Sequence, residues 1–189
     1  MPQIPFQAFF EPNTFHFLTK TIKSFGGYVL YIFMKSNLHI LNSREVRALL
    51  AQLEKQYGCA LQLDYVFLRS DKDKIFIVNR DIELVDFAEL RINSVGLYFC
   101  EISKGGELRL TMEGSQLVGH HAQRNVVALS EDQVRTYFRG EVVDWSEPVD
   151  GQPFLLLKFG CDFFGAAKCK EGKILNYLPK IHRTTELML

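Results

Sequence analysis

The chain has 189 residues, of which 47% are hydrophobic and 23% charged, a composition typical of a globular protein and not of a disordered one. This length predicts one domain or two small ones. The 22 basic and 22 acidic side chains give a formal net charge of zero, so the sum alone favours neither an acidic nor a basic partner.

The cysteines and the apolar runs bear on where the protein resides. Cys59, Cys100, Cys161 and Cys169 are scattered and form no CxxC pair, which excludes a disulfide-rich secreted scaffold. The most apolar run, residues 25–34, has ten residues and no small-residue cleavage site after it, whereas a membrane-spanning helix needs about 20 residues. These features predict a cytoplasmic protein that makes no membrane contact.

Residues 1–33 are dense in phenylalanine and tyrosine and contain a single acid, Glu11. No helical or strand period is visible in this N-terminal extension. Two interpretations stay open. Either the start codon has been assigned upstream of a true start at Met34, or the extension packs its aromatic side chains on the body of the protein or on a partner.

The next elements along the chain are a helix and two hairpins. Asn42 and Glu45 have capping-box spacing, and apolar residues then recur at helical spacing as far as Gly58, which predicts a helix of about four turns. Residues 61–68 and 74–79 are apolar runs joined by a short polar loop, which predicts a hairpin. A short helix is expected over residues 82–90, and a second hairpin over residues 95–102 and 107–112.

The last third alternates short strands with short helical segments. A glycine-bounded segment at 113–119 precedes a predicted strand at 125–129, and Ser130 with Gln133 forms a capping box for a helix that ends at Gly140. A strand is expected at 153–159. Residues 165–170 and 173–178 then form a hairpin around the Glu171-Gly172 turn.

These elements predict an α+β fold with two domains. An N-terminal α/β domain is expected over residues 34–105 and a small β-barrel over residues 106–189. The boundary is placed near residues 104–107, where two glycines interrupt the pattern.

The charges change sign late in the chain. Residues 131–150 carry an excess of four negative charges, and residues 158–183 carry an excess of four positive charges. Strand alternation places Lys168 and Lys170 on one face, and the partner strand adds Lys173 beside them. Such a cluster, with no acid nearby in the sequence, gains most by meeting an anion such as a nucleic-acid backbone. The alternative is a solvated lysine face.

Residues 158–183 carry a recurring family pattern of glycines, an acid, an aromatic residue, a basic strand and a final Pro-Lys pair. Its members are Gly160, Asp162, Phe164, Gly165, Ala167, Lys168, Gly172, Pro179 and Lys180. This segment resembles the closing half of a PUA domain, the small RNA-binding pseudo-barrel of pseudouridine synthases and archaeosine transglycosylases. Residues 108–119 are similar to the first strand and first helix of that family.

The whole layout also resembles ribosome-biogenesis factors in which a pre-PUA domain precedes the PUA domain. It is similar as well to PUA regions associated with archaeal Sun-type RNA cytosine methyltransferases. The resemblance therefore implies a pre-PUA-like domain at 34–105 and a PUA-like pseudo-barrel at 106–189.

PUA domains generally hold RNA between the first helix with its following loop and the last strands. The resemblance thus implies an RNA-binding site formed by Gly114, Gly119, Arg124, Lys158, Lys168, Lys170, Lys173, Tyr177, Lys180, His182 and Arg183. In it, lysines supply point charges, Arg183 makes a bidentate phosphate contact, and glycine backbone allows close approach. Two roles stay open: Tyr177 either stacks on a base or lies in the core, and His182 either meets a phosphate or faces solvent.

No catalytic motif of the GxSxG, P-loop, HExxH or GxGxxG type is present. His120 and His121 point to opposite faces of an extended segment, and no cysteine pair has zinc-finger spacing, so no metal site is predicted. Asp144 and Glu147 lie in a polar stretch that reads as a solvated loop, and Cys161 reads as a structural thiol.

The predicted function is therefore non-catalytic binding of structured rRNA or tRNA, in RNA modification or ribosome biogenesis, without a cofactor. Candidate partners besides RNA are an RNA methyltransferase and pre-ribosomal proteins. Two alternatives stay open. The protein is an accessory subunit of an RNA cytosine methyltransferase, or, from another class, an RNA-modifying enzyme in its own right.

Overall fold

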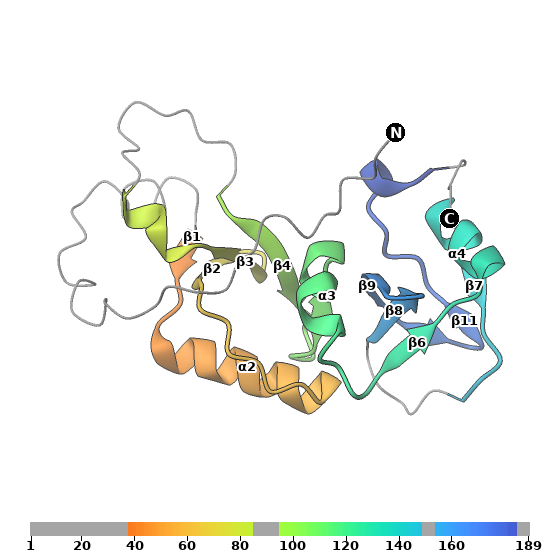
Figure 1. Ribbon diagram of the computed structural model, residues 1–189, viewed down its shortest axis with the longest axis horizontal. Coiled ribbons are helices and arrows are strands. Elements are labelled where there is room, and N and C mark those ends of the chain that lie inside the picture. The colour runs from red at the N-terminus through yellow and green to blue at the C-terminus, as the bar shows by residue number, and fades with distance from the viewer. Residues whose placement is uncertain (1–37, 85–94, 149–153, 185–189) are drawn as a thin grey trace.

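The computed structural model describes residues 38–84, 95–148 and 154–184 (Figure 1). The N-terminal extension and most of the helix predicted at 82–90 lie outside these ranges. At the start of that predicted helix the structure has a 3-10 helix, η3 (Arg80–Leu84). Within the described ranges, no helix is both long and apolar enough to span a membrane.

A five-stranded antiparallel sheet forms the N-terminal part, with its strands side by side in chain order. The strands are β1 (Leu38–Ile40), β2 (Val66–Ser70), β3 (Lys74–Val78), β4 (Leu97–Ile102) and β5 (Leu108–Leu110). Both predicted hairpins are confirmed, as β2–β3 and β4–β5. The first is shorter than predicted, because residues 61–65 form no strand.

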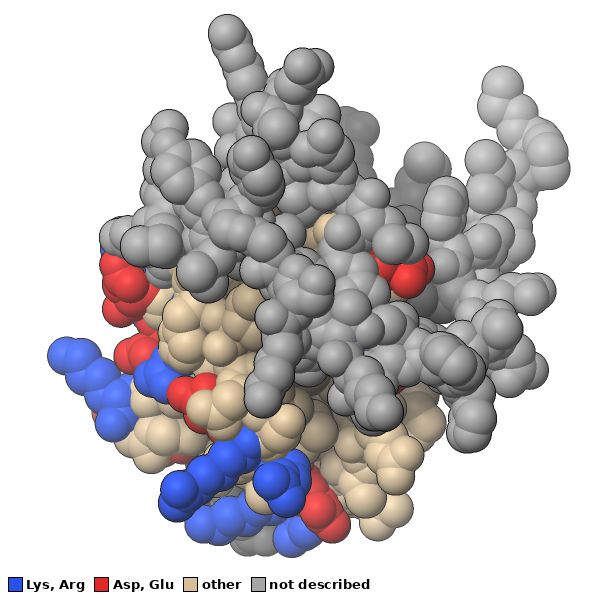
Figure 2. Space-filling model, turned by 90° about the vertical axis from the view of Figure 1, so that its left-hand side faces the viewer, with Lys and Arg blue, Asp and Glu red and all other residues tan. Residues whose placement is uncertain are grey.

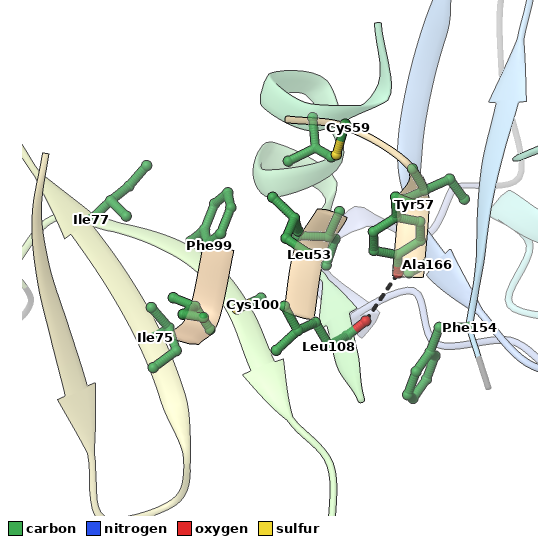
Figure 3. Close-up of a cluster of buried hydrophobic side chains, with 14 of the residues drawn as sticks. Leu53, Tyr57, Cys59, Ile75, Ile77, Phe99, Cys100, Leu108, Phe154 and Ala166 are labelled. Atoms are coloured by element: carbon green, nitrogen blue, oxygen red, sulfur yellow. Dashed lines mark hydrogen bonds between the residues drawn. The ribbon is translucent and has the colours of Figure 1, made fainter. Parts of the chain in front are cut away.

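Helix α2 (Ser43–Tyr57) covers one face of this sheet and confirms the predicted helix at both ends. The Asn42 side chain accepts hydrogen bonds from the backbone N–H groups of Arg44 and Glu45, and Glu45 accepts one from the Asn42 backbone N–H, which completes the capping box. Gly58 ends the helix with φ +69°, a conformation that favours glycine. Leu53 and Tyr57 point from α2 toward the sheet (Figure 3).

The C-terminal part consists of short helices around two small sheets. Its helices are α3 (Met112–Gly119), α4 (Glu131–Phe138) and the 3-10 helix η4 (Lys180–His182). Strands β6 (Val126–Ala128), β8 (Leu155–Phe159) and β9 (Asp162–Ala167) form one sheet, and β10 (Cys169–Lys170), β11 (Lys173–Ile174) and β7 (Val143–Asp144) form the other. The fold is therefore α+β, as predicted.

One detail agrees with the family resemblance and one differs from the sequence prediction. The glycine-bounded segment at 113–119 lies in a helix, α3, whose N-cap is Thr111, as the similarity of residues 108–119 to a first strand and first helix implied. The stretch read as a solvated loop contains strand β7, because Val143 is buried in the core of the C-terminal part and β7 pairs with β11. A two-residue strand leaves too little alternation in the sequence to be recognised.

One hydrophobic core runs through both parts. It joins Leu53 and Phe99 of the N-terminal part with Phe154, Leu156 and Phe163 of the C-terminal part. The two glycines at the predicted boundary form the turn of the β4–β5 hairpin, with φ +82° at Gly106. These glycines therefore form a turn between paired strands, and buried residues on both sides of the turn, such as Phe99 and Leu108, belong to the same core.

A second core surrounds Tyr137 of α4, and this side chain makes folding sensitive to alkali. Burial raises the pKa of Tyr137 to about 12. The unfolded chain ionises first, at a pKa of about 10, so the contribution of Tyr137 is fully present below pH 10 and is lost as the pH rises toward 12.

We expect Tyr137 ionisation to lower the free energy of unfolding by about 1 kcal/mol between about pH 9 and pH 11. Urea unfolding at both pH values measures this change. In Tyr137→Phe the fall should be smaller by that amount. An identical fall in the two proteins would show that Tyr137 is not the responsible group.

Candidate nucleic-acid interface

The structure places the two predicted glycines of the site inside the protein. Gly114 and Gly119 both lie on α3 and are buried. A Cβ atom on Gly114 would stand 2.0 Å from the carbonyl oxygen of Phe99, and one on Gly119 would stand 2.3 Å from the ring of Phe163. These glycines let α3 pack closely on β4 and β9. Their assignment to RNA approach is therefore corrected: the space that they leave is filled by protein.

Arg124 is exposed and lies at the C-terminal end of α2. Its backbone N–H donates to the carbonyl oxygen of Tyr57 at 3.1 Å, and its Nε stands 2.9 Å from where a Cβ of Gly58 would be. The negative end of the α2 macrodipole favours a cation at this position. The first predicted cation of the site is thus held against the N-terminal part.

The β10–β11 turn presents two exposed lysines. Lys170 and Lys173 are direct partners across the hairpin, where two like charges repel one another. Carboxylates are nevertheless close: Lys170 Nζ lies 3.5 Å from Glu171, and Lys173 faces Asp144 of β7. The prediction of a lysine cluster with no acid nearby in the sequence is therefore wrong, because Glu171 lies in the turn itself, and β7 adds an acid from the distant acidic stretch.

Lys168 is tied into the protein by two contacts. Its Nζ lies 3.9 Å from Glu107 and 4.6 Å from the centroid of the Phe154 ring. These partners immediately precede β5 and β8, so Lys168 helps to join the two parts. Lys158 lies on β8, half-buried, and makes no ion pair with any described residue.

Tyr177 is half-buried between the two cores. Its ring packs edge-to-face on Phe154, with centroids 5.9 Å apart, and the guanidinium carbon of Arg109 lies 5.4 Å from the ring centroid. Arg109 is itself paired with Glu101. Of the two roles left open for Tyr177, these contacts favour a place in the core over stacking on a base: the side chain is packed, and a cation already lies beside its ring.

Lys180, His182 and Arg183 lie on or next to η4, which Figure 1 shows at the top of the C-terminal part, away from β11. Arg183 Nε donates to the carbonyl oxygen of Leu178 at 3.1 Å, and the side chain lies against Gly140 at the end of α4. Lys180 is exposed and His182 half-buried. The predicted basic residues therefore occupy several places instead of one cluster.

Two residues that contact this region were not predicted. Glu107, just before β5, pairs with Lys168. Arg109, in β5, lies over the ring of Tyr177. Strand alternation gave a partial signal, since Leu108 and Leu110 are buried and Arg109 between them must project to the other side. Nothing in the sequence indicated that this side meets the C-terminal strands.

The four cysteines are also placed by the structure, and none of them belongs to a metal-ligand set among the described residues. Cys59 and Cys100 are buried, Cys161 is exposed and Cys169 is half-buried, all as free thiols. Burial raises the pKa of the Cys100 thiol, which keeps it protonated and unreactive. Within the described part of the chain, no three His, Cys, Asp or Glu side chains come together as a set of metal ligands.

Comparison with known families gives one match. Residues 124–184 match a family model described as the methyltransferase RsmF PUA domain. The matched segment begins at Arg124 and ends just after Arg183, so it contains every predicted site residue except Gly114 and Gly119. A search of curated proteins found no match. The predicted resemblance to a PUA domain associated with RNA methyltransferases is confirmed over these residues.

Proposed function

Since residues 124–184 form a PUA domain of the RsmF methyltransferase type, we propose that this protein binds structured RNA and has no catalytic activity of its own. The family match is the observation that carries the proposal. The RNA is an rRNA or a tRNA in the cytoplasm, and the protein takes part in its modification or in ribosome biogenesis.

The described side chains support binding through phosphate groups more than through base reading. Lysines 158, 170, 173 and 180 and Arg124 reach solvent, and such side chains contribute point charges that phosphates meet without sequence preference. Tyr177 is half-buried, and Phe154 and Arg109 already pack on its ring. Binding of this kind is expected to weaken steeply as salt is added.

The β10–β11 lysines offer the sharpest test. We expect the double variant Lys170→Gln with Lys173→Gln to bind an rRNA hairpin about tenfold more weakly at low salt, because two phosphate contacts are lost. The slope of log affinity against log salt should become shallower by about 1.5. Fluorescence anisotropy with labelled RNA measures both quantities.

Lysines 72 and 104 supply a matched control, since both are exposed residues of hairpin turns in the N-terminal part. Lys72→Gln with Lys104→Gln removes the same charge, and its affinity should stay within twofold of the unaltered protein. An equal loss in both double variants would argue against the β10–β11 contact. Absence of RNA binding by the unaltered protein would overturn the function itself.

The description of the matched family supports a second candidate function. PUA domains of this type belong to methyltransferases, so the protein is alternatively an accessory subunit that shares RNA with a catalytic partner. Co-purification with an RNA cytosine methyltransferase, and recovery of its activity when the two proteins are mixed, would favour this role. Titration with S-adenosylmethionine by calorimetry separates it from an enzyme: heat of binding to the protein alone would contradict the non-catalytic proposal.

A further inference from the structure

Ion pairing accounts for seven cations of the described residues, and three of the cations without such a partner lie on one helix. Arg69, Arg80, Arg109, Arg135, Arg139, Lys168 and Lys170 each lie within 4.0 Å of a carboxylate. On α2, Arg44, Arg47 and Lys55 have no such partner among the described residues, and all three are exposed. We call these three residues the α2 basic face.

Helical geometry places these cations on a single stripe. At 100° per residue, Arg44, Arg47 and Lys55 fall on the side of α2 opposite to Leu49 and Leu53, which face the sheet. The stripe extends about 16 Å along the axis from Arg44 to Lys55. Figure 2 looks at the end of the molecule where α2 begins, and Lys and Arg side chains gather in its lower part, at the level of α2.

Two of the residues between the cations are small. Ala48 and Ala51 lie on the same stripe and are exposed, so an extended ligand can approach the helix backbone closely there, while one exposed acid, Glu54, borders the stripe beside Lys55. Arg47 Nε donates to the carbonyl oxygen of Ser43 at 3.1 Å, which holds its guanidinium along the helix surface. No large apolar side chain lies on the stripe, and protein partners usually need such anchors. The chemistry therefore fits a polyanion and not a protein surface.

The stripe continues toward the PUA domain. Lys55 lies in the last turn of α2, and Arg124 is held at the end of the same helix by the contacts with Tyr57 and Gly58. Arg124 is also the first residue of the matched PUA segment. Four cations without an ion-pair partner in the described ranges thus follow one another from Arg44 to the start of the PUA domain.

We propose that the α2 basic face is a second RNA contact, which binds the phosphate backbone of an RNA that extends from the PUA domain past Arg124. This inference rests on the proposed RNA-binding function and adds a surface outside the matched segment to it. Phosphate contacts at this face contribute affinity and fix the direction of the RNA but read no bases.

The test uses the full chain and two RNA hairpins that share a loop and differ in stem length. Arg44→Gln with Arg47→Gln should weaken binding of the long hairpin about tenfold and make its salt slope shallower by about 1.5, as expected for two lost phosphate contacts. Binding of the short hairpin, which does not reach α2, should change less than twofold. Both substitutions are at exposed positions, so thermal unfolding should stay unchanged.

Arg135→Gln with Arg139→Gln on α4 is the matched control. It removes the same two charges from another exposed helix, but these arginines are already paired with Glu131 and Glu141. Equal losses in the two arginine variants, or no loss in the α2 variant, would overturn the α2 contact. If Lys170→Gln with Lys173→Gln still weakens both hairpins in that case, the proposed function stands; if the unaltered protein binds neither hairpin, both proposals fail.

Discussion

Gly114→Ala should lower the free energy of unfolding by about 3 kcal/mol, although alanine normally favours a helix over glycine by about 1 kcal/mol. The reason is the approach of α3 to β4: the new Cβ would stand 2.0 Å from the carbonyl oxygen of Phe99, which is backbone and cannot move aside. The helix must shift, and Val118, which is fully buried on α3, shifts with it. Urea unfolding followed by far-UV circular dichroism measures the loss.

Gly105→Ala is the control for this substitution. Gly105 lies in the β4–β5 turn, and its nearest atoms belong to the end of the Glu107 side chain, at 3.0 Å, which can rotate away. Its effect should stay within about 0.5 kcal/mol. If Gly114→Ala were equally mild, α3 would have room that the structure does not give it, and Gly114 would again be available for close approach of RNA.

Gln56→Leu is expected to cost about 2 to 3 kcal/mol of folding free energy. The Gln56 side chain is buried and pairs with β5 as a neighbouring strand would: its Nε2 donates to the Leu108 carbonyl oxygen at 2.8 Å, and its Oε1 accepts from the Leu108 N–H at 2.9 Å. Leucine has nearly the same size but leaves that N–H buried without an acceptor. The carbonyl oxygen keeps its hydrogen bond from Tyr57 (Figure 3).

Gln52→Leu, one turn earlier on α2, separates this effect from the general consequence of removing an amide. Gln52 is only half-buried, so its replacement should change stability by less than about 0.5 kcal/mol. Chemical denaturation of both variants, with protection of the Leu108 amide against hydrogen exchange as a second measurement, tests the assignment. Unchanged protection in Gln56→Leu would contradict it.

Local signals in the sequence were enough to place most helices and hairpins. Both capping boxes were predicted from residues three apart, and both are present, at Asn42 and at Ser130. Such motifs involve neighbours along the chain, so no knowledge of the fold is needed to recognise them. The β2–β3 and β4–β5 hairpins were predictable for the same reason.

The arrangement of the candidate site depended on contacts between distant segments, and there the sequence was a weaker guide. Lys168 meets Glu107, and Lys173 faces Asp144, because β5 and β7 pack beside the last strands. The charge excesses of the acidic and basic stretches are real along the chain but are interleaved in space. Conversely, the α2 basic face has a helical period in the sequence but lies outside the residues that resemble a PUA domain.

The glycines of α3 illustrate a second limit of sequence reasoning. A glycine that lets a ligand approach and a glycine that lets a strand approach look identical in a sequence. Only the positions of Phe99 and Phe163 show that protein occupies the space in this case. The family match, which begins after both glycines, is compatible with this reading.

The core that runs through both parts determines which piece of this protein is able to stand alone. Residues 124–184 by themselves would keep Phe154, Leu156 and Phe163 but lose the side chains of α2, β4 and α3 that enclose them. The segment that matches the family is therefore smaller than the unit that shares this core, and its strands are supported by a sheet outside the family's limits. A different protein that contains this domain would therefore need the same sheet, or another element that covers the same core residues.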